Sequence, residues 1–339
     1  MIIQEAIRVV VSGKNLTTAE SIDVFNEIMS GKSTNAQIAS LITALAIKGE
    51  TSAEITGAAM VMREKGVYIA PEKPDHVIDT CGTGGDGAHT FNISTAAAFV
   101  SAGAGARVAK HGNRSVSSKC GSADVLEALG VSINISAEKM KECLDEIGIC
   151  FLFAPTLHSA MKYAIAPRKE IGIRTIFNIL GPLINPSHAT AQLLGVFSSG
   201  LGPIIAEVLK NTGSHKAYIV YGQDGLDEIT TCAETQVSEL SGETIKTYTI
   251  KPEQFGIPVS ERADITGGDA TENADILKNI LNGKKGPKRD IVILNAAFAL
   301  AAAQKAETPL QGIAMAVESI DSGAAMEKLQ LLIKKSTEK

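Results

Sequence analysis

The 339-residue sequence lacks an ordered cysteine pattern, a long apolar run and an excess of positive charge. Its five cysteines form no C-x-x-C pair, which argues against a disulfide framework or a zinc site and predicts a reduced, cytoplasmic protein; they are Cys81, Cys120, Cys143, Cys150 and Cys232. The net charge of −5 gives no reason to expect a nucleic acid as partner. Any anion site must therefore come from a local cluster of donors.

No segment has the composition of a membrane span or a targeting peptide. The longest apolar stretch, IVILNAAFALAAA from Ile291, has 13 residues and contains Asn295, whereas a membrane-spanning helix needs about 20. The first residues are interrupted by Glu5 and Arg8 and are followed by no cleavage-site pattern, so we do not expect a signal peptide. We expect no membrane partner, and we predict that the apolar stretch is a buried helix.

The first 66 residues carry helix signals. Three motifs of the form T-x-x-E/Q, at Thr17–Glu20, Thr34–Gln37 and Thr51–Glu54, each precede an apolar run with helical spacing. In such capping boxes the two side chains satisfy free amide groups at the start of a helix. Two of the runs end in a glycine, which is favoured just past a helix. We predict a small N-terminal helical domain over residues 1–68.

From residue 74 onwards, short apolar runs alternate with runs of helical periodicity. The expected strands are HVIDTC, ARVAKHG, VSINI, ICFLFA, ATAQLLGVF and KAYIVYG, and the chain is expected to finish with helices around 271–282, 290–306, 309–321 and 324–335. This alternation predicts an α/β domain, with a mainly parallel central sheet flanked by helices, over residues 74–155 and 188–339. Residues 156–187 are helix-like, and we expect them to complete a discontinuous helical domain.

Residues 79–95, DTCGTGGDGAHTFNIST, contain the spacing G-x-G-x-x-G at Gly82, Gly84 and Gly87. Dinucleotide-binding loops have this spacing, but they also need an acidic residue roughly 20 positions later for the ribose hydroxyls. No Asp or Glu occurs between Asp86 and Asp124, and the stretch carries cations instead: Arg107, Lys110, Arg114 and Lys119. The sequence therefore argues against an NAD site. No P-loop string follows a strand either.

The same segment has the features of a phosphate site. Its glycines permit positive φ angles and let backbone N–H groups approach a ligand. The string NIST, from Asn92, lies where a helix is expected to begin, and free amides there favour an anion. A second loop, KHGNRSVSSKCGSAD from Lys110, follows the next strand. Because ligands gather at the carboxyl ends of parallel strands, we expect the two loops to share one pocket.

A third segment, YGQDGLDEIT, supplies Asp224, Asp227 and Glu228 at the end of another expected strand. Mg²⁺ binds through one or two carboxylates together with substrate phosphates, so these acids are candidate ligands. Acids in turns are also common on protein surfaces. Cys81 and Cys120 border the glycine-rich segments, and we interpret them as small buried residues rather than nucleophiles.

Together with APTLHSAMK, RKEIGIRTIFNILGPLINP, ITGGDATENA and LNAAFAL, these strings resemble the anthranilate phosphoribosyltransferase family over nearly the whole chain. The resemblance implies a pentosyltransferase of tryptophan biosynthesis. Such an enzyme transfers the 5-phosphoribosyl group of 5-phosphoribosyl 1-diphosphate (PRPP) to the amino group of anthranilate, releases diphosphate and uses Mg²⁺. The resemblance also implies the nucleoside phosphorylase-like fold of class III phosphoribosyltransferases and a homodimer joined through the helical domain.

Matching motifs carry over the family's site residues. The PRPP site would be lined by Gly82, Gly85, Asp86, Thr90, Asn92, Ile93, Ser94, Thr95, Lys110, His111, Gly112, Asn113, Arg114, Ser115, Val116, Ser117, Ser118 and Ser122. Anthranilate would contact Gly82, Asn113 and Arg168, and Mg²⁺ would bind at Ser94, Asp227 and Glu228. The family's usual wording before the arginine is A-P-V-R, whereas this chain has AIAPRKE. We expect Pro167 to lie in the first turn of a helix, where proline is tolerated.

These residues supply donors, cations and metal ligands but no obvious nucleophile. Displacement at the anomeric carbon would then depend on holding the two substrates together and neutralising the departing diphosphate. His111 or His158 could accept the proton of the amine, or each could simply be hydrogen-bonded in the fold, and we name no general base. Two alternatives stay open: a pyrimidine nucleoside phosphorylase of the same fold, and a non-catalytic regulator that binds PRPP or a nucleotide.

Overall fold

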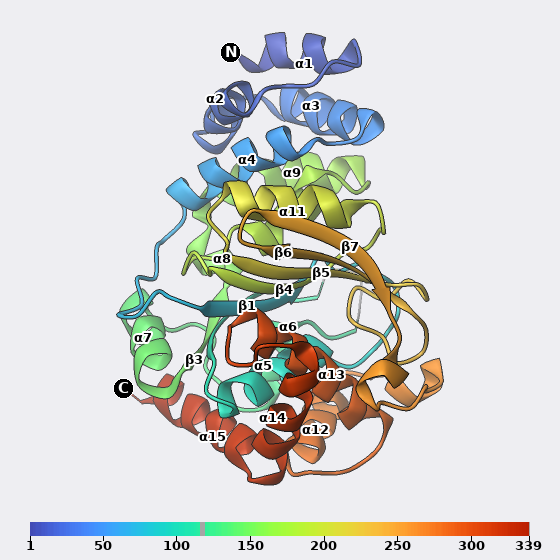
Figure 1. Cartoon of the computed structure of the whole chain (residues 1–339). Coiled ribbons are helices and arrows are strands. Elements are labelled where there is room, and N and C mark those ends of the chain that lie inside the picture. Colours follow the sequence, from blue (N-terminus) through green and yellow to red (C-terminus); the bar gives the residue numbers. More distant parts are fainter. Residues whose placement is uncertain (116–118, 339) are drawn as a thin grey trace.

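The chain is built around a seven-stranded sheet, as the computed structural model in Figure 1 shows; the structure describes residues 1–115 and 119–338. The strand order is β3-β2-β1-β4-β5-β6-β7. The first five strands in this order pair in parallel, and β6 and β7 are antiparallel. This confirms the mainly parallel sheet. The strands are β1 Val77–Gly82, β2 Arg107–Gly112, β3 Ile149–Phe153, β4 Ala191–Gly195, β5 Lys216–Gly222, β6 Thr235–Ser241 and β7 Thr244–Ile250.

Helices cover both faces of the sheet (Figure 1). Those before and between the strands are α1 Ile3–Val11, α2 Thr18–Met29, α3 Asn35–Lys48, α4 Ser52–Lys65, α5 Ile93–Gly103, α6 Ser122–Ala128, α7 Ala137–Glu142, α8 Ala154–Leu157, α9 Lys162–Ile171, α10 Ile176–Leu180 and α11 Leu201–Asn211. The C-terminal helices are α12 Ala270–Leu281, α13 Pro287–Ala302, α14 Pro309–Asp321 and α15 Ala324–Thr337, close to the predicted ranges. A π-helical turn spans Cys143–Ile147, and 3-10 turns span Ser159–Met161, Gly181–Leu183, Pro252–Phe255 and Arg262–Ile265.

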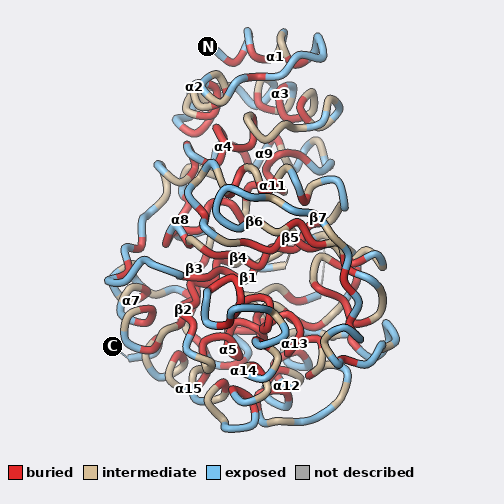
Figure 2. The backbone as a smooth tube through the Cα atoms, in the orientation of Figure 1, coloured by how far each residue is buried: buried red, intermediate tan, exposed pale blue. Residues whose placement is uncertain are grey.

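Two hydrophobic cores lie on opposite faces of the sheet. Successive side chains of a strand point to opposite faces, so Leu193 packs in the core that α5 and α13 complete, while Leu194 packs in the core with α4 and α11. Figure 2 shows that buried backbone is concentrated in the sheet and in the helices that lie directly on it. The stretch from Ile291 to Ala303 is buried throughout and confirms the predicted buried helix.

The N-terminal helices begin where the capping boxes predict. Thr17, Thr34 and Thr51 are the N-cap residues of α2, α3 and α4, and each hydroxyl accepts a hydrogen bond from the backbone N–H three residues later. Helices α9 and α10, from the excursion over residues 156–187, pack against the N-terminal helices: α9 against α2 and α3, and α10 against α3 and α4. A discontinuous helical domain requires this packing, and the exact division of the chain stays a prediction.

Three local expectations are wrong. Residues 131–135, VSINI, form no strand: Val131 and Ile133 are buried as in a strand, but β3 occupies the sheet edge beside β2. The hairpin of β6 and β7 was not expected, because its second strand, TIKTYTI, is mostly exposed and lacks a long apolar run. Pro167 lies inside α9 rather than in its first turn, because residues 162–166 already continue the helix from the preceding 3-10 turn.

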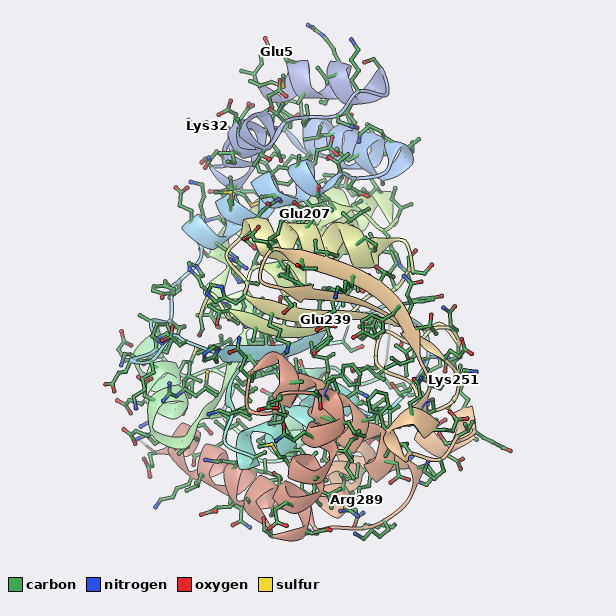
Figure 3. All side chains as sticks on the ribbon, viewed as in Figure 1. Glu5, Lys32, Glu207, Glu239, Lys251 and Arg289 are labelled. Carbon is green, nitrogen blue, oxygen red and sulfur yellow. The ribbon has the colours of Figure 1, made fainter. Side chains whose placement is uncertain are left out.

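Within the described residues, none of the helices combines the length and apolar composition needed to cross a membrane. Charged side chains occur along the length of the molecule. Figure 3 labels Glu5 and Lys32 at the end formed by the N-terminal helices and Arg289 at the opposite end.

Candidate active site

The predicted loops meet at one edge of the sheet. Strand β1 ends at Gly82, which pairs with Gly195 at the end of β4, and the neighbouring strand β2 ends at Gly112. Strand β5 pairs in parallel with β4 and ends at Gly222, a few residues before the acidic segment. Because the carboxyl ends of parallel strands lie at the same edge, three segments far apart in sequence come together there.

The acidic segment packs directly against the glycine loop. Asp227 Oδ2 accepts a hydrogen bond of 2.8 Å from the Gly84 N–H group. A Cβ atom on Gly82 would collide with the Asp227 carboxylate, and one on Gly195 would overlap the Asp227 backbone carbonyl. Glycine is therefore required at the ends of both strands for close approach of the acidic segment. Asp86 caps its own turn, since its Oδ1 accepts from the Ala88 N–H at 3.0 Å.

The first turn of α5 forms the second part of the site. Asn92 is the N-cap residue of this helix, and the Ser94 N–H donates to Glu228 Oε1 at 3.2 Å. Lys110 is buried, and its ammonium group donates to the Thr80 carbonyl and to Ser94 Oγ, the latter at 3.3 Å. The predicted residues Ser94, Lys110 and Glu228 are thus in direct contact.

Three further predicted residues lie around the same helix start. Thr90 forms an isolated bridge with Thr266, and Ile93 is buried in the core beneath the site. Thr95 is buried, and its hydroxyl has no hydrogen-bond partner among the described residues. Thr90 and Ile93 thus have structural contacts within the fold, whereas the hydroxyl oxygen of Thr95 makes no hydrogen bond to a described residue.

Burial and mutual repulsion change the protonation of the two carboxylates. Burial raises the pKa of Asp227 to about 7, and the charge of Asp86 acts in the same direction. Burial also raises the pKa of Glu228 to about 8, the charge of Asp227 adds to this, and Lys110 opposes it. A cation between these groups would lower both pKa values and favour the ionised forms.

No group of three or more His, Cys, Asp or Glu side chains is arranged to hold a metal ion in the part of the chain that the structure describes. Mg²⁺ does not need such a cage, because it commonly takes one or two carboxylates and completes its shell with phosphate and water oxygens. The Asp227–Glu228 pair with the Ser94 hydroxyl therefore fits magnesium held jointly with a phosphorylated substrate, and does not fit a metal bound by protein ligands alone.

The second loop turns toward α6. Arg114 pairs with Asp124 at 2.9 Å and with Glu127 at 2.6 Å, so its guanidinium group is engaged by the helix that follows the loop. The Ser115 N–H also donates to Asp124. The Asn113 carbonyl accepts from the Ser122 hydroxyl, the first residue of α6, at 3.2 Å. Gly112 is packed closely against Ser122 and Phe151. Val116, Ser117 and Ser118 lie outside the described residues.

Arg107 lies apart from Lys110 and Arg114 in the folded chain. It is the first residue of β2, so it lies at the amino-terminal edge of the sheet, and its guanidinium donates to the Lys73 carbonyl at 3.0 Å. Arg107 is only three residues from Lys110 in the sequence, but the six-residue strand β2 places it at the opposite end from Gly112.

The excursion over residues 156–187 places His158 and the Gly181 carbonyl against His111 at the same edge, whereas Arg168 packs on Phe177 of the excursion itself. His111 Nδ1 makes a hydrogen bond of 3.1 Å with the Gly181 carbonyl, and the rings of His111 and His158 pack edge to face at 5.1 Å. Burial lowers the pKa of His111 to about 3 and that of His158 to about 4, so both rings are neutral at pH 7. Arg168 lies on α9, with its guanidinium 5.3 Å from the centre of the Phe177 ring, and burial lowers its pKa.

Two contacts at the site were missed by sequence reasoning. Arg174 donates to the Gly85 carbonyl and stacks on the Phe197 ring at 4.6 Å, so it ties the excursion to the glycine loop. Asn273 donates to Asn92. Both residues lie in sequence strings that carry the family resemblance, IGIRT and ITGGDATENA. This resemblance is the signal in the sequence that could have identified them. Their contacts depend on long-range packing that spacing does not reveal.

Comparison with known proteins gives consistent matches along the chain. Residues 4–66 match the helical bundle domain of a glycosyl transferase family, and residues 74–326 match the a/b domain of a glycosyl transferase family. The chain is 56% identical to the anthranilate phosphoribosyltransferase of Acetivibrio thermocellus, over 96% of this chain and 94% of that protein. It is 52% identical to that of Geotalea uraniireducens, over 99% and 100% of the two chains.

Solved structures agree with these matches. The anthranilate phosphoribosyltransferase of Thermus thermophilus superposes with a TM-score of 0.94 at 38% identity, covering 98% of this chain and 99% of the other. That of Saccharomyces cerevisiae, in complex with PRPP and Mg, gives a TM-score of 0.89 at 30% identity, covering 99% and 98%. These relatives do not favour a nucleoside phosphorylase or a non-catalytic regulator.

Proposed function

Because this chain belongs to the anthranilate phosphoribosyltransferase family, we propose that the carboxyl edge of its sheet holds PRPP and that the excursion supplies the contact to anthranilate. The family's activity is transfer of the 5-phosphoribosyl group from PRPP to the amino group of anthranilate, with release of diphosphate. It is a step of tryptophan biosynthesis.

The observation that carries the PRPP assignment is the meeting of the glycine loop with the start of α5. Both present backbone N–H groups, of which those of Gly84 and Ser94 here donate to the carboxylates of Asp227 and Glu228. The partial positive charge of a helix N-terminus favours an anion such as a phosphate. Gly84, Gly85 and Gly87 all have positive φ angles, between 68° and 77°, which non-glycine residues rarely adopt. The loop backbone can therefore approach a phosphate closely. Lys110 adds a positive charge beneath it.

We assign the PRPP site to the residues predicted from the motifs, with the second loop binding the diphosphate. In that loop the backbone N–H groups and hydroxyls are the expected donors, because Arg114 is already paired with Asp124 and Glu127. Lys110 orients Ser94 rather than extending its side chain toward solvent, since its ammonium group is buried against Thr80 and Ser94.

For Mg²⁺ we propose Ser94, Asp227 and Glu228 as the residues that hold it. The yeast relative is described in complex with PRPP and Mg. In this chain the pKa values of the Asp227 and Glu228 carboxylates are raised, and a bound cation would lower them again. When bound there, Mg²⁺ supplies charge neutralisation to the departing diphosphate.

Anthranilate carries a carboxylate, and the Arg168 guanidinium can pair with it in a bidentate manner. Gly82 and Asn113 are assigned to the same substrate, at the ends of neighbouring strands β1 and β2. The aromatic amine attacks as a neutral group, so no strong base is needed before attack. The chain holds the amine and the anomeric carbon together, and this positioning is its main contribution to rate. His111 and His158 are both neutral nearby.

We further propose a cytoplasmic homodimer joined through the helical domain. Five cysteines without a disulfide among the described residues are compatible with a reducing compartment. Four of the exposed large apolar side chains lie on the N-terminal helices and α9, where the dimer contact is proposed; they are Val11, Ile47, Tyr163 and Ile165.

The test uses a double variant, Asp227→Asn with Glu228→Gln, in an assay that follows loss of anthranilate fluorescence with PRPP and Mg²⁺. We expect turnover to fall by at least about 100-fold, because the leaving group loses its charge neutralisation, and the dependence of rate on Mg²⁺ concentration to disappear. The matched control is Glu253→Gln with Asp275→Asn, which makes the same chemical changes at exposed positions. Unchanged kinetics in the first variant would remove the metal assignment, and an inactive control would mean that the loss is unspecific.

A further inference from the structure

The segment that leads into α12 packs against the start of α5, although about 175 residues separate them in sequence. Thr266 bridges to Thr90, and the Gly267 N–H donates to the His89 carbonyl at 2.9 Å. A Cβ atom on Gly267 would lie 2.5 Å from the Phe91 backbone nitrogen and 2.7 Å from Asn273 Oδ1. The two backbones can approach this closely only because residue 267 is glycine.

Asn273 is 1% exposed and uses both ends of its amide in this contact. Its Oδ1 accepts from the Gly268 N–H at 2.8 Å, and its Nδ2 donates to Asn92 Oδ1 at 3.0 Å. Asn92 in turn donates from Nδ2 to the Cys120 carbonyl at 3.2 Å. The hydrogen bonds therefore run in series from the α12 segment, through the N-cap of α5, to the second loop.

The direction of this series is fixed by its ends. A backbone N–H can only donate and a backbone carbonyl can only accept. The Gly268 N–H thus sets the orientation of the Asn273 amide, and the Cys120 carbonyl requires Nδ2 of Asn92 to point toward it. If Asn273 could not donate, Asn92 Oδ1 would keep only the weaker Sγ–H donor of Cys120, at 3.4 Å, and the Asn92 amide would be held less firmly. Figure 1 shows α5, α6 and α12 on the same side of the sheet, and α12 packs against both of the others.

We propose that Asn273 is a positioning residue for PRPP binding, acting through Asn92 to hold the start of α5 and the second loop at a fixed separation. This inference rests on the proposed function, because Asn92 and both loops are assigned there to PRPP. Asn273 itself binds no substrate in this scheme. Its effect is on the two elements that do. The anthranilate contact proposed at Arg168 lies on α9, outside this series of hydrogen bonds, so any effect on anthranilate would come only through Asn113 in the second loop and is expected to be smaller.

The test measures PRPP and anthranilate separately, by steady-state kinetics and by calorimetric titration with PRPP and Mg²⁺. For Asn273→Ala we expect KM and Kd for PRPP to rise about tenfold, the effect of losing one well-oriented hydrogen bond, with KM for anthranilate within about twofold of its original value. Asn273→Asp keeps the size of the side chain and the acceptor for Gly268 but cannot donate to Asn92. We expect it to weaken PRPP binding at least as much.

A control on the same helix separates positioning from loss of stability. Leu277 is fully buried in α12, and its side chain has no atom that could hydrogen-bond to either loop. Leu277→Ala should therefore lower the melting temperature while KM for PRPP stays unchanged. A double-mutant cycle with Asn92→Ala tests the route. In that background Asn273→Ala should weaken PRPP binding by no more than about twofold, because the group it acts through is already gone.

Each possible outcome either supports or refutes the positioning role of Asn273. A rise of KM for PRPP that disappears in the Asn92→Ala background supports the proposal. Equal effects of Asn273→Ala and Leu277→Ala on PRPP, or an equal effect of Asn273→Ala in both backgrounds, overturns it. If Asn92→Ala weakens PRPP binding and Asn273→Ala does not, the positioning role fails while the proposed PRPP site stands. If neither weakens it, the positioning role fails and the assignment of Asn92 fails with it.

Discussion

We expect the buried pair of His111 and His158 to make the stability of this protein sensitive to acid. Both rings are almost fully buried, with His158 at 5% and His111 at 6% exposure, and their centroids are 5.1 Å apart. Burial lowers the pKa of His158 to about 4, against an unfolded value near 6.5, although the Ile184 carbonyl favours the protonated ring. The unfolded chain therefore takes up a proton at a pH where the folded chain does not.

The magnitude follows from linkage. For a base with a lowered pKa, the contribution to stability is present above the unfolded pKa and is lost as the pH falls below it. Between pH 7 and pH 5.5, a histidine with a pKa of about 4 in the folded state and about 6.5 in the unfolded state costs about 1.2 kcal/mol. The raised pKa values of Asp227 and Glu228 act with the opposite sign, because the folded state then holds protons that the unfolded chain releases.

The measurement is therefore a difference between variants. We replace His158 with Gln and, separately, with Phe, and measure the free energy of unfolding by urea titration at pH 7 and pH 5.5. The carboxylates contribute equally to each protein and cancel in the difference. We expect both variants to lose about 1.2 kcal/mol less than the original chain between these pH values, whatever their stability at pH 7.

Two results would refute this reasoning. One is an identical pH dependence in all three proteins, which would mean that His158 is protonated in the folded chain as readily as in the unfolded one. The other is a change in only one of the two variants, which would trace the effect to packing rather than to titration.

Two further predictions concern residues that hold the elements in place. Glu54 is fully buried, and its carboxylate accepts hydrogen bonds from the Leu16 N–H group and from the Lys48 ammonium group. Glu54→Ala should lower the free energy of unfolding by about 3–5 kcal/mol, because it removes one partner of a buried ion pair. Urea titration measures this loss, and a value below about 1 kcal/mol would contradict the prediction. Gly195→Ala should displace Asp227 and abolish turnover, because the added Cβ would overlap the Asp227 backbone. The control is Gly200→Ala, at a position with open space around it, which should leave kcat intact. Equal kcat values for the two variants would show that the close approach of Asp227 to strand β4 is not needed.

Much of this molecule could be predicted from local sequence. The capping threonines Thr17, Thr34 and Thr51 place the starts of three helices, because a capping box is satisfied within four residues and needs no distant partner. The glycine loop is recognisable for a similar reason. Positive φ angles and a polar helix start are properties of consecutive residues.

Contacts between distant segments could not be predicted in this way. Val131 and Ile133 have the alternation of a strand, yet whether they form one depends on which neighbour lies beside β2, and β3 takes that place. Arg107 and Lys110 are three residues apart in one strand, and the extended backbone separates their side chains between opposite edges of the sheet.

Sequence alone determined the fold class, the chemistry of the loops and, through the motifs, the family. The tertiary structure decided how those loops are held: Asp227 against Gly82, Arg174 on Gly85, and Asn273 on Asn92. The physical reason is range. A cap or a turn is stabilised by groups a few residues apart, whereas the position of a loop is fixed by hydrogen bonds from segments that the folded sheet and its helices bring together.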